Sequence, residues 1–205
     1  MRIASARMFV AALALACAAC ASTTMKDSWF DPAARTMPFG KVLVIAVGAD
    51  LAQQRIFEDI LADKLRTAGV DGVQGYRFLP EGKASEEEMN AAVKRAGADG
   101  LMLVRFKGVR TETEVRSSMV PGPVGAGWYG AYGGWYGSWY GAPQVYQWRV
   151  ATIETSVYDV TSKKLVWTGV TETYDPASFR KDAGRLADII VGAIAANKLT
   201  PKAVA

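Results

Sequence analysis

Apolar and polar positions follow two periods along residues 40–197, and these periods divide that part of the chain into strands and helices. Largely apolar runs at 41–50 (KVLVIAVGAD, which ends in Gly and Asp) and 101–106 are typical of strands that are buried on both faces. Apolar residues at helical spacing predict three helices, over 51–68, about 86–96 and about 175–196. A less regular apolar segment at 73–79 predicts one further strand.

Capping residues mark where the predicted helices begin. Asp50 stands directly before the first helix, and residues 85–88 (SEEE) form a capping box before the second, which Gly97 ends. Asp175 and Pro176 predict the start of the third helix, because proline suits the first helical turn.

The second half of the chain has the pattern of paired strands around a long loop. Residues 109–116 alternate between Val or Thr and charged side chains, which is typical of a strand with one solvated face. Residues 147–160 and 165–173 predict two strands joined by a turn at 161–164. Residues 117–146 are predicted to form a loop inserted before this pair.

These elements give the order β-α-β-α-β, long loop, β-β-α. The alternation predicts an α/β (α+β) fold in a single domain, with a mixed sheet of about five strands covered by three helices. The first half of the sheet is expected to be parallel and the terminal hairpin antiparallel. We assign this domain to residues 40–200, with the loop insertion at 117–146.

Residues 1–19 have the pattern of an export signal. Arg2 and Arg7 precede an apolar run at 8–19 that is too short to span a bilayer. The small residues followed by Cys20 resemble the lipobox of bacterial lipoproteins, which implies cleavage before Cys20 and lipidation of that residue. Cys17 is the alternative acylation site, and an ordinary secretory signal is the alternative interpretation. Residues 20–39 then predict the lipidated cysteine and a polar tether.

Cysteine usage and charge agree with this interpretation. The chain has two cysteines, Cys17 and Cys20, so the predicted domain has no disulfide framework. Several acyl chains on one cysteine would anchor it stably, and Ala21 in place of Asp favours sorting to the outer membrane. Removal of the signal leaves 22 basic and 20 acidic residues, a net charge of +2. Because the charges are mixed in sign, nucleic acid is not an expected partner.

The segment VYDVTSKKLVWTGVTE, residues 157–172, resembles a hairpin of small Gram-negative envelope lipoproteins that reads Asp-x-x-Thr-Gly-Lys-x-x-Trp. These lipoproteins include uncharacterised families and, more distantly, LpoB-type activators of penicillin-binding proteins and CsgG-type curli-secretion lipoproteins. Ser162 stands where that hairpin usually has glycine. The resemblance implies a helix-covered sheet, but the families share no single function.

Catalytic chemistry has few candidate residues. The chain has no histidine, which excludes Ser-His-Asp and Cys-His catalysis and most transition-metal sites. Two carboxylate pairs could in principle hydrolyse a glycoside: Glu112 with Glu114 on one strand face, and Glu154 with Glu172 across neighbouring strands. The alternating charges at 110–116 are more typical of a solvated strand face. We therefore expect no enzymatic activity, no metal site and no cofactor.

Residues 127–141, GWYGAYGGWYGSWYG, hold half of the chain's tryptophans and half of its tyrosines. Loops as long as 117–146 are usually functional or disordered. Four interpretations stay open: the rings stack on sugars or a protein partner at the cell wall, they lie at a membrane interface, the segment self-associates, or it has no ligand. The candidate binding residues are Trp128, Tyr129, Tyr132, Trp135, Tyr136, Trp139 and Tyr140. Trp148 and Trp167 are assigned to the core or the sheet edge.

Taken together, these patterns predict a non-catalytic outer-membrane lipoprotein that faces the periplasm and has a binding or structural role in the cell envelope. Its expected partners are the membrane, through the lipid anchor, and peptidoglycan or an envelope protein. The first alternative is an accessory activator or assembly factor for a cell-wall synthase or secretion machine. The second alternative is a carboxylate-based glycan hydrolase.

Overall fold

The computed structural model describes residues 22–33, 37–116, 144–176 and 178–201. Its elements, in chain order, are β1 (Ser22–Phe30), β2 (Lys41–Val47), α2 (Leu51–Thr67), β3 (Asp71–Gln74), the 3-10 helix η2 (Gly75–Arg77), α3 (Glu86–Ala96), β4 (Gly100–Arg116), β5 (Gln144–Asp159), β6 (Leu165–Tyr174) and α5 (Phe179–Ala196).

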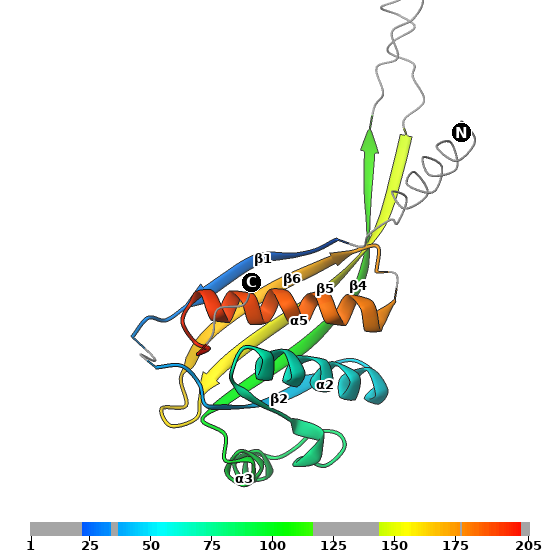
Figure 1. Cartoon of the computed structure of the whole chain (residues 1–205). Coiled ribbons are helices and arrows are strands. Elements are labelled where there is room, and N and C mark those ends of the chain that lie inside the picture. Colours follow the sequence, from blue (N-terminus) through cyan, green and yellow to red (C-terminus); the bar gives the residue numbers. More distant parts are fainter. Residues whose placement is uncertain (1–21, 34–36, 117–143, 177, 202–205) are drawn as a thin grey trace, which may run out of the picture.

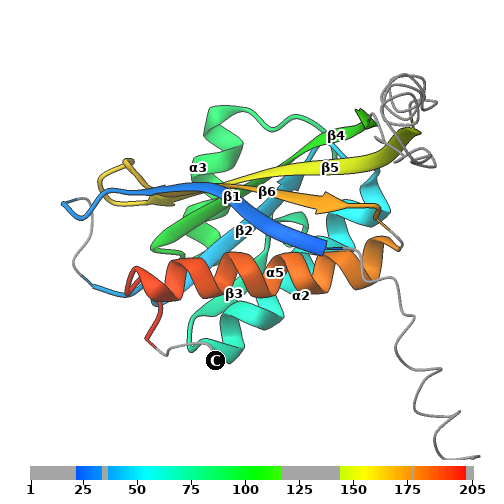
Figure 2. The same cartoon turned by 90° about the horizontal axis from the view of Figure 1, so that it is seen from above.

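The strands form one mixed sheet in the order β1-β6-β5-β4-β2-β3. β2 pairs in parallel with β3 and β4, whereas the pairs β4–β5, β5–β6 and β6–β1 are antiparallel. Figures 1 and 2 show α2 and α5 on one face of the sheet and α3 on the other. The predicted fold class is confirmed, with six strands where about five were expected.

Two apolar clusters hold the layers together. The larger one lies under α2 and α5, where Phe57, Leu61 and Ile190 pack with the sheet and are fully buried. The smaller one lies under α3 and contains Leu43 and Ile45 of β2. β2 is therefore covered on both faces, which explains its uninterrupted apolar sequence. Beyond α3, the face opposite α2 and α5 carries polar side chains of β5 and β6, and it is called the open face below.

Strand β1 corrects the tether predicted over residues 20–39. Residues 22–30 pair with β6 from Ser22–Tyr174 to Phe30–Trp167, with a bulge between Met25 and Asp27. The sequence pattern hides this strand, because an edge strand leaves many of its side chains in solvent and the bulge interrupts their alternation.

The helix caps agree with the sequence at two of the three predicted starts. The Asp50 carboxylate accepts a hydrogen bond from Gln53 N at 3.0 Å, and Ser85 and Glu88 form the reciprocal capping box. α5 begins later than predicted, at Phe179 with Ser178 as its cap. Asp175 instead has a φ of 46° and accepts a hydrogen bond from Arg149 N, so it belongs to the turn that follows β6.

The β5–β6 turn accommodates serine at the position where the hairpin motif that it resembles usually has glycine. Ser162 donates from both N and Oγ to Asp159 Oδ1, at 2.7 and 2.8 Å. The left-handed conformation falls on Lys163 instead, with a φ of 57°. The turn therefore closes without a glycine.

The sequence analysis assigned Trp167 to the core or to the sheet edge. In the structure it lies in the core, and its ring is fully buried. Gly169 lies close beside this ring: a Cβ built on Gly169 would be 2.5 Å from Trp167 Cη2. Glycine is needed here because the buried ring has no room to move.

We expect Gly169→Ala to destabilise the domain by about 1–3 kcal/mol, because the added methyl group overpacks the site of Trp167. The matched control is Gly184→Ala in α5, where an added Cβ has no heavy atom within 4 Å. That control should be neutral or stabilising by up to about 1 kcal/mol, since alanine favours helices. Urea unfolding of the three proteins measures both effects, and equal stability of Gly169→Ala and the parent would contradict the packing argument.

Candidate functional site

Several unusual features meet at one end of the sheet, called the ribbon end. Ser22 of β1 pairs with Tyr174 of β6, Tyr174 pairs with Val150 of β5, and Val150 pairs with Arg110 of β4. These four residues form one row across the sheet. Beyond this row β4 and β5 continue for six residue pairs that end at Arg116–Gln144, with no third strand from the described residues beside them. At about 3.4 Å per residue, this two-stranded ribbon extends about 20 Å past the sheet. Figure 1 shows the ribbon projecting from this end of the sheet.

The ribbon and its base carry exposed apolar side chains. Val109 is 60% exposed, Val145 57% and Tyr146 45%. Trp148 is half-buried, and its Nε1 donates a hydrogen bond to Glu112 Oε2 at 3.2 Å. Trp148 therefore lies on the ribbon rather than in the core.

The residues predicted for lipidation and for binding lie outside the described residues. They are Cys20 and the seven candidate binding residues Trp128, Tyr129, Tyr132, Trp135, Tyr136, Trp139 and Tyr140. Because Arg116 pairs with Gln144, both ends of the aromatic-rich segment are attached at the outer end of the ribbon. β5 begins at Gln144, so residues 144–146 of the predicted loop belong to a strand.

A bulge between Phe106 and Gly108 decides which β4 side chains reach the open face. Before the bulge, Met102, Val104 and Phe106 point toward α2 and α5. The extra residue, Lys107, shifts the alternation by one position, so that Arg110 joins the open face. Gly108 has a φ of 112°, a conformation that favours glycine.

Polar side chains from three strands form a connected cluster on the open face of the ribbon end, and this open-face cluster consists of Lys26, Arg110, Glu112, Glu172 and Tyr174. Arg110 Nη2 lies 2.6 Å from Glu172 Oε1 and 2.8 Å from Glu112 Oε1. Glu172 Oε2 accepts a hydrogen bond from the Tyr174 hydroxyl at 3.0 Å and lies 3.3 Å from Lys26 Nζ. The cluster therefore joins β1, β6 and β4 across the sheet.

Contacts within the open-face cluster favour the charged forms of Glu172, Arg110 and Lys26. The hydrogen bond from Arg110, with smaller contributions from Tyr174 and Lys26, lowers the pKa of Glu172. Contact with Glu172 and Glu112 raises the pKa of Arg110, and contact with Tyr174 and Glu172 raises the pKa of Lys26. Glu172 is thus ionised at neutral pH and forms ion pairs with Arg110 and Lys26. Contacts of this kind are typical of residues that stabilise a fold.

The carboxylate pairs considered from the sequence are occupied by other partners. Glu154 lies 2.6 Å from Arg105 and 3.3 Å from Lys107, and its pKa is lowered chiefly by the hydrogen bond from Arg105. Glu154 and Glu172 do not face each other, because Glu154 pairs with Val170 and Glu172 with Thr152. Glu112 is engaged by Arg110 and Trp148.

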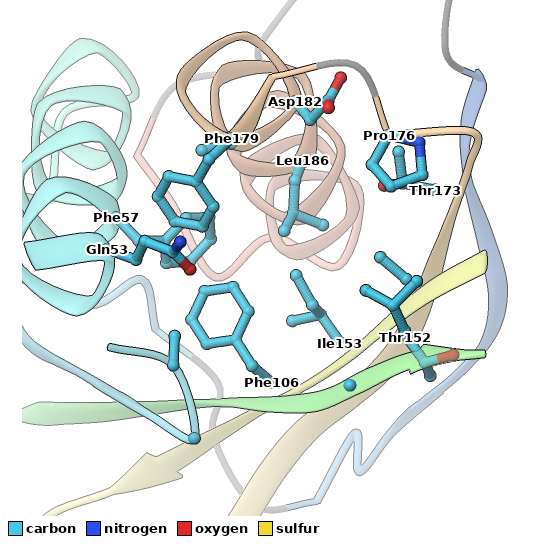
Figure 3. A pocket seen from close by; sticks show the side chains of 16 residues that line it. Gln53, Phe57, Phe106, Thr152, Ile153, Thr173, Pro176, Phe179, Asp182 and Leu186 are labelled. Carbon is cyan, nitrogen blue, oxygen red and sulfur yellow. The ribbon is translucent and has the colours of Figure 1, made fainter. Parts of the chain in front are cut away.

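A pocket lies on the opposite face of the ribbon end, between the sheet and the first turns of α2 and α5. Its volume is about 310 Å³. Figure 3 shows Phe57 and Phe179 from the two helices and Phe106 and Ile153 from the sheet around it. The Phe57 and Phe106 rings meet edge to face with centroids 5.5 Å apart.

Polar groups are few in this pocket. Gln53, Thr152, Thr173 and Asp182 line it among apolar residues. Asp182 is 8% exposed, and its Oδ2 accepts a hydrogen bond from Ser178 N at 3.1 Å. Its Oδ1 is buried and has no hydrogen-bond partner among the described residues.

Within the described part of the chain, no group of three or more His, Cys, Asp or Glu residues is placed to hold a metal ion. No helix among the described residues is both long enough and apolar enough to cross a membrane.

Comparison with known proteins gives similarities in structure alone. No protein-family model and no curated protein matches the chain. Among solved structures, it is similar to PelC from Paraburkholderia phytofirmans, with 15% identity, a TM-score of 0.46, and coverage of 84% of this chain and 96% of PelC. It is also similar to the lipoprotein GNA1162 from Neisseria meningitidis, with 12% identity, a TM-score of 0.40, and coverage of 77% and 99%. The resemblance to LpoB and CsgG stays a prediction, and function is inferred below from the chain's own residues.

Sequence patterns did not indicate the open-face cluster or the pocket. Lys26 was assigned to the tether, so its contact with Glu172 was not expected. The one usable signal was the alternation around the bulge in β4, where the apolar residues Val104 and Phe106 stand at even positions and Val109 and Val115 at odd positions.

Replacing Glu172 by glutamine should lower stability at neutral pH and reduce the loss of stability in acid. The folded-state pKa of Glu172 lies below the ordinary value of 4.5, so its stabilisation is present above that pH and is lost as the pH falls through the folded-state value. Thermal unfolding at pH 7 and pH 3 should therefore show the largest difference between the two proteins at pH 7.

The control is Glu81→Gln, which removes an exposed ion pair with Arg55. Such pairs contribute about 0–1 kcal/mol, so this control should change little. A pH-independent difference between Glu172→Gln and the parent would contradict the electrostatic role of the cluster.

Proposed function

We propose that the chain is a non-catalytic lipoprotein of the outer membrane, and that its β4–β5 ribbon binds at the periplasmic surface of the bilayer. The observation that carries this proposal is the row formed by Ser22, Tyr174, Val150 and Arg110. It places the start of β1 beside the base of the ribbon, as Figure 1 also shows.

The anchor is short in this proposal. Cys20, the expected lipidated residue, precedes Ser22 by two residues, which span at most about 7 Å. The acyl chains lie in the bilayer, so they hold the ribbon end of the sheet near the membrane surface. The β5–β6 turn, at the opposite end of β5, is kept farther away.

The ribbon is suited to this position. Its exposed Val145 and Tyr146 contribute apolar contact area, and the adjoining segment contains the seven Trp and Tyr residues singled out above. Tryptophan and tyrosine gather at membrane–water interfaces because their rings are amphipathic. This supports the membrane interface over the cell wall among the four interpretations of the aromatic segment.

The electrostatics of the carboxylates support a non-catalytic role. A glycosidase needs one carboxyl group with a raised pKa as general acid, whereas the pKa values of Glu154 and Glu172 are lowered. Burial raises the pKa of Glu58, but that residue is 4% exposed and accepts hydrogen bonds from Ala46 N and Tyr76 N. Glu58 therefore connects β2 to η2, and a backbone N–H donor occupies each of its carboxylate oxygens.

Site-specific labels test the orientation. If Cys20 is acylated, the mature chain has no free thiol, so one introduced cysteine carries a unique nitroxide label. In the lipidated protein on vesicles, a label at Val145→Cys should collide with oxygen dissolved in the bilayer. A label at Thr161→Cys, in the β5–β6 turn, should collide with a water-soluble nickel complex instead.

Equal access of the nickel complex to both labels would contradict the proposed orientation. Co-sedimentation with purified sacculi, performed with the intact chain and with a chain lacking residues 122–142, tests the cell-wall alternative. Binding to sacculi that disappears with this deletion would assign the aromatic segment to peptidoglycan and overturn the membrane proposal.

Cys20→Ala should abolish lipidation and processing at that site. Metabolic labelling with a radioactive fatty acid, followed by fractionation of the envelope, measures both. Normal acylation of Cys20→Ala would transfer the anchor to Cys17, and a Cys17→Ala variant serves as the matched control.

A further inference from the structure

The pocket at the ribbon end arises from the fold of the domain and does not depend on the proposed membrane orientation. β2 ends at Val47, whereas β4 and β5 continue, so the inner face beyond Phe106 has no neighbouring strand from the described residues on that side. A space of about 310 Å³ is left between the sheet and the two helices, at the lower end of the range for small-molecule sites. Small residues line this region, namely Gly48, Ala49, Gly108, Ala151 and Ala183.

The floor of the pocket is elongated across the strands. Val109 of β4, Ala151 of β5 and Thr173 of β6 form one cross-strand row, and all three line the pocket. At about 4.8 Å between neighbouring strands, this row spans about 10 Å. Its β4 end is open, since Val109 is 60% exposed, and its β6 end is closed, since Thr173 is 5% exposed. A ligand that follows the floor is therefore extended and enters at the β4 end.

The walls of the pocket are apolar and only partly covered by the protein itself. Phe57, Phe106 and Phe179 form a continuous aromatic surface, with centroid distances of 5.5 and 5.9 Å between successive rings. Phe106 and Phe179 stay partly exposed although they pack against the main core. Ile153 and Leu186 lie beside them (Figure 3). A ligand in this space would bury its apolar body against these side chains.

Most polar side chains that line the pocket use their polar atoms elsewhere. Thr152 Oγ1 accepts a hydrogen bond from Arg110 on the open face, at 2.6 Å. Thr173 Oγ1 is paired with Thr23 Oγ1 at 3.0 Å. Asp182 Oδ2 caps the first turn of α5, and Figure 3 shows this carboxylate directed away from the phenylalanine rings. The interior of the pocket therefore offers apolar contact and few hydrogen-bonding groups.

We propose that this pocket binds one extended hydrocarbon chain of an amphiphile, with the chain over Ala151 and against the phenylalanine rings. The methyl end of the chain lies toward Thr173, and the head group stays in water at the open end, beside Val109 and Gln53. A free fatty acid and a membrane phospholipid both supply such a chain. In the orientation proposed above, this end of the sheet lies near the bilayer, but the class of ligand rests on the pocket alone.

Alkyl maltosides with hexyl, octyl, decyl and dodecyl chains test the class of ligand, because they share one uncharged head group. They are used below their critical micelle concentrations. The protein is the non-acylated mature chain, residues 20–205 with Cys20→Ser, which retains every described residue. Calorimetry and the methyl chemical shifts of Ile153 and Leu186 measure binding. Affinity should rise about fourfold with each methylene group that finds room on the floor, and then level off when the chain reaches the closed end.

Substitutions at Ala151 test the position of the chain. Because Ala151 lies in the middle of the floor row, Ala151→Val and Ala151→Leu should weaken the binding of decyl maltoside progressively. Leucine should weaken it about tenfold, as expected for the loss of about two methylene contacts. Ala91→Leu, at an exposed position on α3, is the matched control and should bind like the parent. Thermal unfolding verifies that each variant is folded.

Two further samples distinguish the sources of the chain. Decanoate represents a free fatty acid, and nanodiscs of phosphatidylethanolamine and phosphatidylglycerol represent the bilayer. The sample that shifts the methyl groups of Ile153 and Leu186 identifies the source, and shifts in either one support the proposal.

The proposal is overturned if no maltoside shifts the two methyl groups, if affinity rises along the series without levelling off, or if Ala151→Leu binds decyl maltoside like Ala91→Leu. If Ala151→Leu fails to fold, the smaller Ala151→Val and the chain-length series still decide the outcome. Because the maltoside measurements use the protein in solution, their result is separate from the nitroxide test of membrane orientation.

Discussion

The antiparallel pairing of β4 with β5 is the constraint on which the rest of the structure depends. It runs from Gly100–Asp159 to Arg116–Gln144 and is longer than any other pairing in the sheet. One part of it supports the core, where both strands lie under α2 and α5. The other part leaves the sheet as the ribbon. A single backbone ladder therefore joins the folded domain to the segment that carries the aromatic residues.

The bulge in this ladder gives the two faces of the ribbon end their different chemistry. The side chain added by Lys107 reverses the alternation, which sends Arg110 to the polar face and Val109 to the pocket side. Arg110 then meets Glu172, and Val109 contributes to the wall of the pocket. A regular strand would have placed a charged guanidinium group over the apolar pocket. One extra residue thus separates the open-face cluster from the apolar cavity.

The sequence predicted those parts of the fold that depend on local pattern. The helical spacing of apolar residues in α2 and the capping box at Ser85 in α3 depend on residues only a few positions apart. Both helices are present in the structure. β1 was missed because an edge strand is defined by its partner β6, more than a hundred residues away. The start of α5 was misplaced for a similar reason, since Asp175 is held by Arg149 of a neighbouring strand. The pocket depends on where β2 ends relative to β4, which no local pattern records.

The pairing of β1 with β6 also bears on how strongly the ribbon must bind. A long flexible tether would let the domain sample a large volume above the bilayer, and its ribbon would meet the surface only occasionally. Since the sheet begins at Ser22, only Ala21 separates the predicted anchor, Cys20, from the sheet that carries the ribbon. Short links of this kind raise the effective concentration of a second contact to about the millimolar range. A ribbon with only millimolar intrinsic affinity would then be bound for much of the time, and the selectivity of the protein would come from its tether length as much as from its aromatic rings.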